Sequence, residues 1–209
     1  MFEAVRDFFM NILNLFKTYT VKEVTGIDTH MSAAMYERIR LWQDMAAGNA
    51  DWNDKAPPSG VLSQIAGRLA MMVLREIAVE VRNDAIMPVM KHLDANIDKI
   101  VEYIALLGSA LIRPIYSAGK LQYEALPLGN YLPTSYDFDG SLTGALILKQ
   151  IVDDKKLYLL TEQHAYTDGA HSVECALYRN DSGTLHKVSL TACPQTADIT
   201  PSYTWQHVK

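Results

Sequence analysis

Four residues in the last third of the chain could do chemistry together. Glu162, His164 and Tyr166 alternate along one predicted strand, and His171 follows after a short polar turn. Side chains two residues apart in a strand point to the same face, so the first three would share one side of a sheet. A carboxylate beside an imidazole can bind a metal ion or relay a proton. This group is therefore the best local candidate for a functional site.

The length of the turn decides whether His171 joins this group. A three-residue loop over 167–169 would pair Ala165 with His171 and point His171 away from His164. A change of register by one residue would reverse that orientation. We predict a polar sheet face with one hydrogen bond between Glu162 and His164. A metal-dependent enzyme centred on these two residues is the less favoured alternative.

Motifs typical of enzymes do not occur elsewhere in the sequence. It contains no G-x-S-x-G, no phosphate-binding loop, no H-E-x-x-H and no G-x-G-x-x-G. Asp51 and Asp54 lack the spacing of a calcium-binding loop. The segment 137–140 is typical of a turn. We expect no catalytic residue, no cofactor and no metal ligand, and we predict that the protein is not an enzyme.

Composition and charge limit the other classes of function. Hydrophobic residues make up 49% and charged residues 21% of the 209 residues, which is typical of a folded domain. The net charge of −5 and the lack of a Lys/Arg-rich run predict only weak binding to DNA. Cys175 and Cys193 form no C-x-x-C pair, so we expect two free thiols in a reducing compartment. No signal peptide or membrane-spanning helix is expected.

Hydrophobic periodicity changes along the chain. It predicts a helical region over 1–108, an antiparallel β region over 109–191 and an irregular tail over 192–209. Helices followed by strands, without alternation, indicate an α+β fold. We therefore expect about four N-terminal helices packed on a C-terminal antiparallel sheet of hairpins, as one compact unit.

The helices are predicted over 2–17, 29–47, 59–81 and 88–108, with Asp28 or Thr29 capping the second and Gly108 ending the fourth. The first helix has one apolar face, which we expect to contact the protein's own body or a sister subunit: Phe2, Val5, Phe8, Phe9, Ile12, Leu15 and Phe16. The core stripe of the second is predicted as Met31, Met35, Ile39, Trp42 and Met45. That of the third is predicted as Leu62, Ile65, Leu69, Met72, Val73 and Ile77. Strands are predicted over 110–116, 120–126, 131–137, 142–152, 156–166, 170–179 and 184–190.

The order of several segments resembles that of portal proteins of tailed bacteriophages, in the branch found in siphophages of Gram-positive hosts. The segments are Met31-x-x-x-Met35 through Trp42-x-x-Met45-x-x-Gly48 and Trp52, then Ile65-Ala66-x-x-Leu69-Ala70, Leu107–Pro114, Tyr131–Asp137 and Leu157–His164. The resemblance covers roughly residues 30–180, and the shared order and spacing carry it.

The resemblance implies a structural role without chemistry of its own. Portal proteins form a ring at one capsid vertex, through which the genome is packaged and ejected. The implied partners are sister portal subunits, the terminase, scaffold or capsid proteins, head-completion proteins and the DNA in the channel. The implied location is the virion, after assembly in the host cytoplasm.

The resemblance is confined to the N-terminal wing region of the family. Family members continue beyond this length with stem, clip and often crown segments. The chain is therefore expected to be a fragment, a truncated reading frame or a short relative. A rival hypothesis is a non-enzymatic interaction module that uses the apolar face within 2–17 to bind a partner or a membrane, although its polar face is not Lys/Arg-rich.

Overall fold

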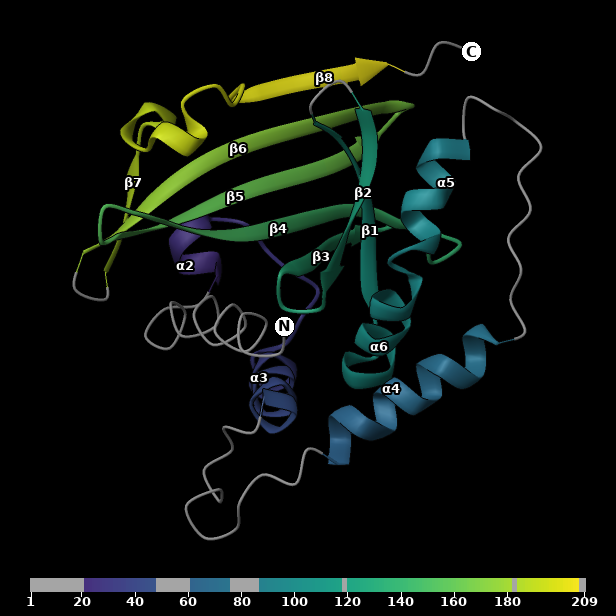
Figure 1. Cartoon of the computed structure of the whole chain (residues 1–209). Helices are drawn as coiled ribbons and strands as arrows, with labels where there is room; N and C mark the ends of the chain where they lie inside the picture. Colours follow the sequence, from purple (N-terminus) through teal and green to yellow (C-terminus); the bar gives the residue numbers. More distant parts are fainter. Residues whose placement is uncertain (1–20, 48–60, 76–86, 118–119, 182–183, 207–209) are drawn as a thin grey trace, which may run out of the picture. The chain divides into compact units, whose positions relative to one another are not determined.

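The computed structural model describes residues 21–47, 61–75, 87–117, 120–181 and 184–206 (Figure 1). The chain divides into two compact units. One consists of Met1–Glu37 and Gly129–Lys209, and the other of Arg38–Leu128. These boundaries differ from the sequence-based division at 108, because the first unit combines an N-terminal segment with the distant strands.

The first unit is built on an antiparallel sheet with the order β3-β4-β5-β6-β7 (Figure 1). Its strands are β3 (Tyr131–Tyr136), β4 (Leu142–Asp153), β5 (Lys156–Thr167), β6 (Ala170–Asp181), β7 (Thr184–Val188) and β8 (Ser202–Gln206). The outer edge of β6 is shared, since β7 pairs with residues 177–181 and β8 with residues 170–174. Two short strands thus cover one long edge.

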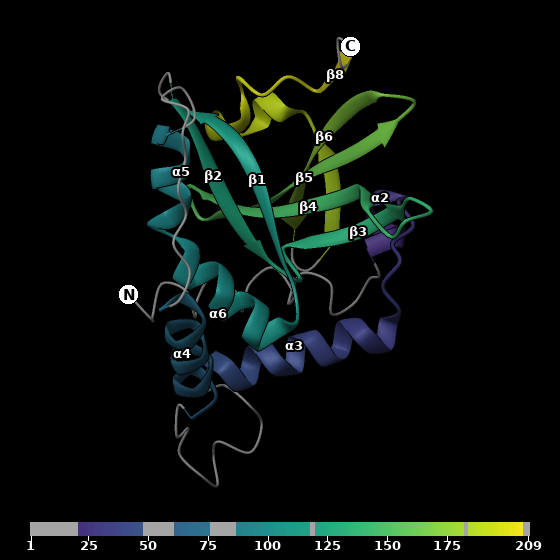
Figure 2. The same ribbon diagram turned by 90° about the vertical axis from the view of Figure 1, so that its right-hand side faces the viewer.

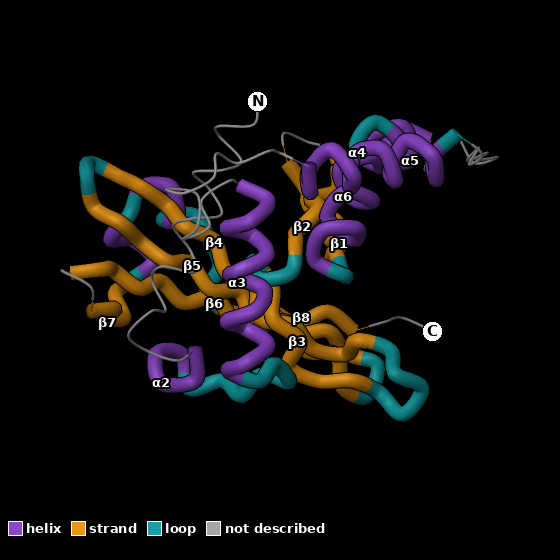
Figure 3. The backbone as a smooth tube through the Cα atoms, turned by 90° about the horizontal axis from the view of Figure 1, so that it is seen from below, coloured by secondary structure: helices purple, strands orange, loops and turns teal. Residues whose placement is uncertain are grey.

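One face of this sheet forms a leucine-rich core. Its buried strand residues are Leu132, Leu146, Leu148, Leu159 and Tyr178. The helix α2 (Val21–Thr25) covers them through Val21 and Val24, and Tyr36 of α3 (Ala33–Ala47) packs against them as well. Figure 3 shows α2 alongside the sheet. Burying one leucine side chain contributes about 1.5–3 kcal/mol, so this face is a main source of stability.

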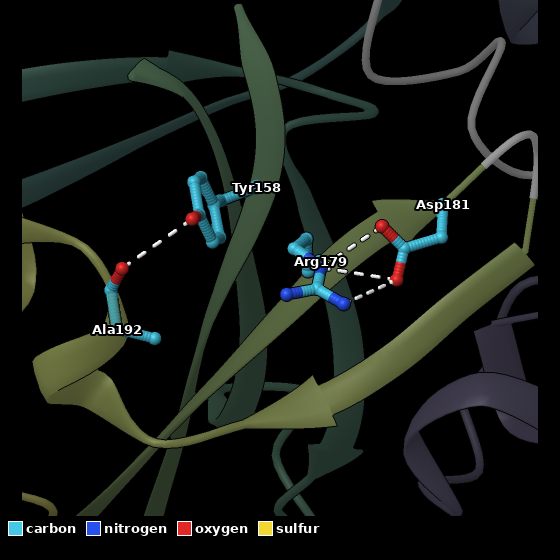
Figure 4. Close-up of polar contacts among 4 residues, drawn as sticks. All are labelled: Tyr158, Arg179, Asp181 and Ala192. Atoms are coloured by element: carbon cyan, nitrogen blue, oxygen red, sulfur yellow. Dashed lines mark hydrogen bonds and ion pairs between the residues drawn. The ribbon is translucent and has the colours of Figure 1, made fainter. Parts of the chain in front are cut away.

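The opposite face of the sheet has a smaller core at its far end. Tyr158, Leu160 and Leu177 pack there with the fully buried Cys193. Cys193 lies between two short 3-10 helices, η1 (Leu190–Ala192) and η2 (Pro194–Thr196). The hydroxyl of Tyr158 donates to the carbonyl of Ala192 over 3.3 Å (Figure 4). The segment after β7 therefore returns across this face.

The second unit combines helices with a two-stranded ribbon (Figure 2). Its elements, after the end of α3, are α4 (Val61–Leu74), α5 (Met87–Asp94), α6 (Ile97–Leu107), β1 (Ala110–Ser117) and β2 (Lys120–Pro127). The helix α4 packs on α6, and both α5 and α6 pack on β2. Arg113 and Glu124 face each other across the ribbon and form an ion pair of 2.6 Å. The side-chain amide of Gln43 donates to the carbonyl of Leu128 over 3.0 Å.

The predicted α+β class is confirmed, and so are the seven predicted strands to within about two residues. Three features differ. The strands β1 and β2 form a separate sheet instead of joining the main one. The tail over 192–209 is not irregular throughout, because it contains η2 and β8. The prediction missed β8 because Pro194 and Pro201 interrupt the pattern before it.

The predicted helices are partly correct. Gly108 ends α6 with φ of 81°, as expected. The helix α3 begins at Ala33 instead of Thr29, because the Ser32 hydroxyl accepts the Met35 N–H over 3.2 Å and acts as the cap. The predicted helix over 88–108 is two helices, α5 and α6, separated at 95–96. The short helix α2 was not predicted. The predicted helix over 2–17 and its apolar face lie outside the described residues.

The predicted core stripes of α3 and α4 are wrong in part. In α3, Ile39 is buried as predicted, but Met35 and Met45 are exposed and Gln43 is buried. In α4 the residues that are buried are small, Ala66 and Ala70, at 3% exposure each. The predicted stripe is exposed at Ile65, Leu69, Met72 and Val73. Small side chains let two helices approach closely, and this favours the alanine face for packing on α6.

The alanine face of α4 gives a first prediction. Enlarging a side chain in a packed interface causes strain, so Ala70→Leu is expected to lower the free energy of unfolding by about 1–3 kcal/mol. The control is Met72, an exposed residue of the same helix. Met72→Ala should change the free energy of unfolding by less than about 0.5 kcal/mol. Urea denaturation followed by circular dichroism measures both. Equal effects of the two changes would contradict the assignment of the buried face.

Candidate functional site

The turn between β5 and β6 sets the geometry of the candidate site. Asp168 and Gly169 have φ of 52° and 78°, and Thr167 pairs with Ala170. A two-residue loop with positive φ at both positions is a type I′ turn, for which Asp-Gly is a preferred sequence. The loop is therefore one residue shorter than predicted. His171 pairs with Tyr166 instead of Ala165.

The predicted orientation of His171 is consequently wrong. His164 and His171 lie on the same face of the sheet as diagonal neighbours on β5 and β6. His164 Nδ1 lies 3.2 Å from His171 Nε2, and the two ring planes differ by 24°. One nitrogen must donate and the other accept, so this contact requires that at least one of the two imidazoles is neutral.

Glu162 completes the cluster on the same face. Its Oε2 lies 3.5 Å from His164 Nε2, and the side chains of Glu162 and His164 are 15% and 22% exposed. This separation is longer than an ordinary N–H···O hydrogen bond. His164 Nε2 is buried and has no hydrogen-bond partner within the described part of the chain. The predicted pair is thus brought together, but as a charge contact instead of a hydrogen bond.

The environment of His171 favours its neutral form. Burial is the larger cause that lowers the pKa of His171, and the positive charge of a protonated His164 lowers it further. Tyr166, on the same face, remains 45% exposed. The cluster therefore lies at the margin between core and solvent, where a proton or an ion from solution can reach it.

The cluster cannot supply a full set of protein ligands. In the described ranges no group of three or more His, Cys, Asp or Glu side chains is arranged to hold a metal ion. Cys175 pairs with Glu162 across the strands, and neither it nor Cys193 forms a disulfide bond; Cys193 is buried, as predicted, whereas Cys175 is only partly buried. What the arrangement offers is two imidazole nitrogens that face each other and one carboxylate behind them.

The other acidic residues singled out in the sequence either form a turn or lie outside the described residues. The segment 137–140 is a turn, as predicted, in which the Asp139 carboxylate accepts the Ser141 N–H over 2.8 Å. Hydrogen bonds from Ser141 lower the pKa of Asp139. Asp51 and Asp54 belong to the undescribed range 48–60.

Sequence reasoning missed one ion pair in the sheet. The guanidinium of Arg179 donates two bonds from Nε and one from Nη2 to the Asp181 carboxylate, at 2.7–3.0 Å (Figure 4). The two residues are two apart on β6, a spacing that places them on one face. The pair is exposed at the end of the strand, so its contribution to stability is small.

Comparisons with known proteins do not identify a family. No model of a known protein family matches the chain, and a search of curated proteins found no match. No described helix is both long and apolar enough to cross a membrane.

The pKa of His171 gives a second prediction. Because its pKa is lower in the folded than in the unfolded chain, the folded state binds fewer protons there, and stability is lost as the pH falls below the ordinary value of 6.5. In an NMR titration the His171 ring should have a midpoint below 6.5, and His171→Gln should lose less stability between neutral and mildly acidic pH than the wild type. His186→Gln is the control, since His186 is exposed on β7. A midpoint at or above 6.5 would contradict the burial of His171.

Proposed function

We propose that the chain is a structural subunit of a tailed-phage portal and contributes part of its wing region. The observation that carries the proposal is the order of the family-like segments along the chain. Five of them fall on described elements: on α3, on α4, at the junction of α6 and β1, on β3 and on β5. Gly108 ends a helix where the resembling segment has its small-residue turn. The resemblance implies a structural role without chemistry of its own.

The proposed role brings specific partners. These are sister portal subunits, the terminase, scaffold or capsid proteins, head-completion proteins and the DNA that passes through the channel. The net charge of −5 and the lack of a Lys/Arg-rich run favour only weak binding of this chain to DNA. The protein would act in the host cytoplasm during assembly and at the capsid vertex of the virion.

The exposed face of α4 supports an assembly role. It presents four large apolar side chains that are 46–69% exposed: Ile65, Leu69, Met72 and Val73. Contiguous apolar surface of this kind is typical of protein–protein contacts. A ring joins unlike faces of neighbouring subunits, so each subunit needs contact surfaces outside its own core. We assign this face to a sister subunit within the proposed ring.

Localisation in the particle tests the proposed function directly. Antibodies raised against the purified chain should label one vertex in each capsid of the source phage, as seen by immunogold electron microscopy. A portal occupies one vertex only, whereas a major capsid or decoration protein would be labelled over the whole shell. Absence from purified particles, or labelling of the whole shell, would overturn the proposal.

The α4 face gives a prediction that does not require particles. Leu69→Glu together with Met72→Glu should shift the chain toward monomer in sedimentation velocity, because charge on the apolar face opposes association. Gln64→Glu adds charge at another exposed position of the same helix and should leave association unchanged. If the wild type is already monomeric at all concentrations, or if the control has the same effect, the face is not a self-association surface.

A further inference from the structure

We propose that His164 and His171 form a binding site for a divalent transition metal ion such as Zn²⁺, with Glu162 as the carboxylate that orients His164. This site goes beyond the portal proposal and does not depend on it. It rests on the register of the β5–β6 hairpin, which places the two imidazoles side by side. The prediction from sequence had put them on opposite faces of the sheet.

The first support is the distance between the two ring nitrogens. Zn²⁺ binds imidazole nitrogen at about 2.0–2.1 Å in tetrahedral geometry, so two such ligands lie about 3.3 Å apart. His164 Nδ1 and His171 Nε2 are 3.2 Å apart and face each other. A metal ion at this distance from both nitrogens lies beside the line that joins them, so rotation of the two rings admits it with little movement of the backbone. Imidazole nitrogen suits Zn²⁺, Ni²⁺ and Cu²⁺, whereas Mg²⁺ prefers oxygen ligands.

The second support is the position of Glu162. A histidine that binds a metal through one nitrogen commonly donates its other N–H to a carboxylate, which fixes the tautomer and the ring orientation. Glu162 Oε2 is 3.5 Å from His164 Nε2, the nitrogen on the far side from His171. When the ion binds, the proton of His164 resides on Nε2 and points to the carboxylate, and Nδ1 is free to bind the ion. Shortening this contact would also give the buried Nε2 a partner.

The third support is electrostatic. A divalent ion carries positive charge that is costly to bury without a negative partner nearby. The negative charge of Glu162 offsets part of the charge that the ion brings into a half-buried position. On the same face of this unit Tyr166 lies opposite His171, and Cys175 lies opposite Glu162.

The number of ligands sets the expected strength. Only two histidines are placed to bind the ion, and the described residues provide no group of three. Water would complete the coordination, so the affinity should be in the micromolar range and far below that of a four-ligand structural zinc site. The hairpin holds the two rings in place before the ion arrives, which reduces the entropic cost of binding.

Calorimetric titration of the untagged full chain with ZnCl₂ at pH 7.5 tests the site. We expect one ion per chain and no heat with MgCl₂. His164→Ala and His171→Ala should each weaken binding by more than about tenfold, and Glu162→Gln by roughly tenfold, the usual effect of losing an orienting carboxylate. His186→Ala removes an exposed histidine elsewhere in the sheet and should leave the affinity unchanged.

A measurement on the wild type guards against variants that fail to fold. Addition of Co²⁺ should shift or broaden the NMR signals of the His164 and His171 rings before those of His30 and His186. It should also produce the visible absorption of nitrogen-bound Co²⁺, which is lost as acid protonates the rings. The proposal is overturned if the folded wild type shows no saturable Zn²⁺ binding, if His171→Ala binds equally well, or if Co²⁺ acts first on another histidine.

Discussion

The two-residue turn at Asp168 and Gly169 is the constraint on which the main sheet depends. Both residues lie in the left-handed backbone region, and together they fix how β5 pairs with β6. Because side chains alternate along a strand, a shift of one residue would exchange the two faces of β6. Tyr178 would then leave the leucine-rich core, Leu177 would leave the opposite core, and both would face the wrong side. The same turn places His171 beside His164, so the core and the candidate site share one cause.

The long strand β6 needs cover along its outer edge. Unpaired N–H and C=O groups on such an edge can form hydrogen bonds with a strand of another chain, which promotes aggregation. Here β7 pairs with one half, the segment through η1 and η2 packs on one face of the sheet, and β8 pairs with the other half. Cys193 is buried in the middle of this segment. The hydroxyl of Thr196 donates a hydrogen bond to the carbonyl of Leu190 over 2.6 Å. The tail is thus part of the fold of this unit and not an appendage.

The second unit follows a different packing rule. Its helix α4 buries two alanines and exposes its larger apolar side chains, because close approach to α6 gains more contact than a looser fit of large residues. The outcome is an apolar surface that is unusual for a protein that acts alone. The sheet unit, by contrast, buries leucines on both of its faces and carries the cluster of Glu162, His164 and His171 near its margin. One unit therefore offers a surface for association, and the other offers a compact group of ionisable side chains.

The sequence by itself determined the local structure. Alternation and turn residues located β1 to β7, Gly108 located the end of α6, and the spacing of Glu162 and His164 placed them on one face. These features depend on residues close together in the chain. Tertiary structure decided the rest: the face of α4 that packs, the pairing of β8, the division into units and the position of His171. Each of these is a choice between near-equal local alternatives. Only contacts between distant segments supply the free energy that separates them, and hydrophobic pattern alone does not record those contacts.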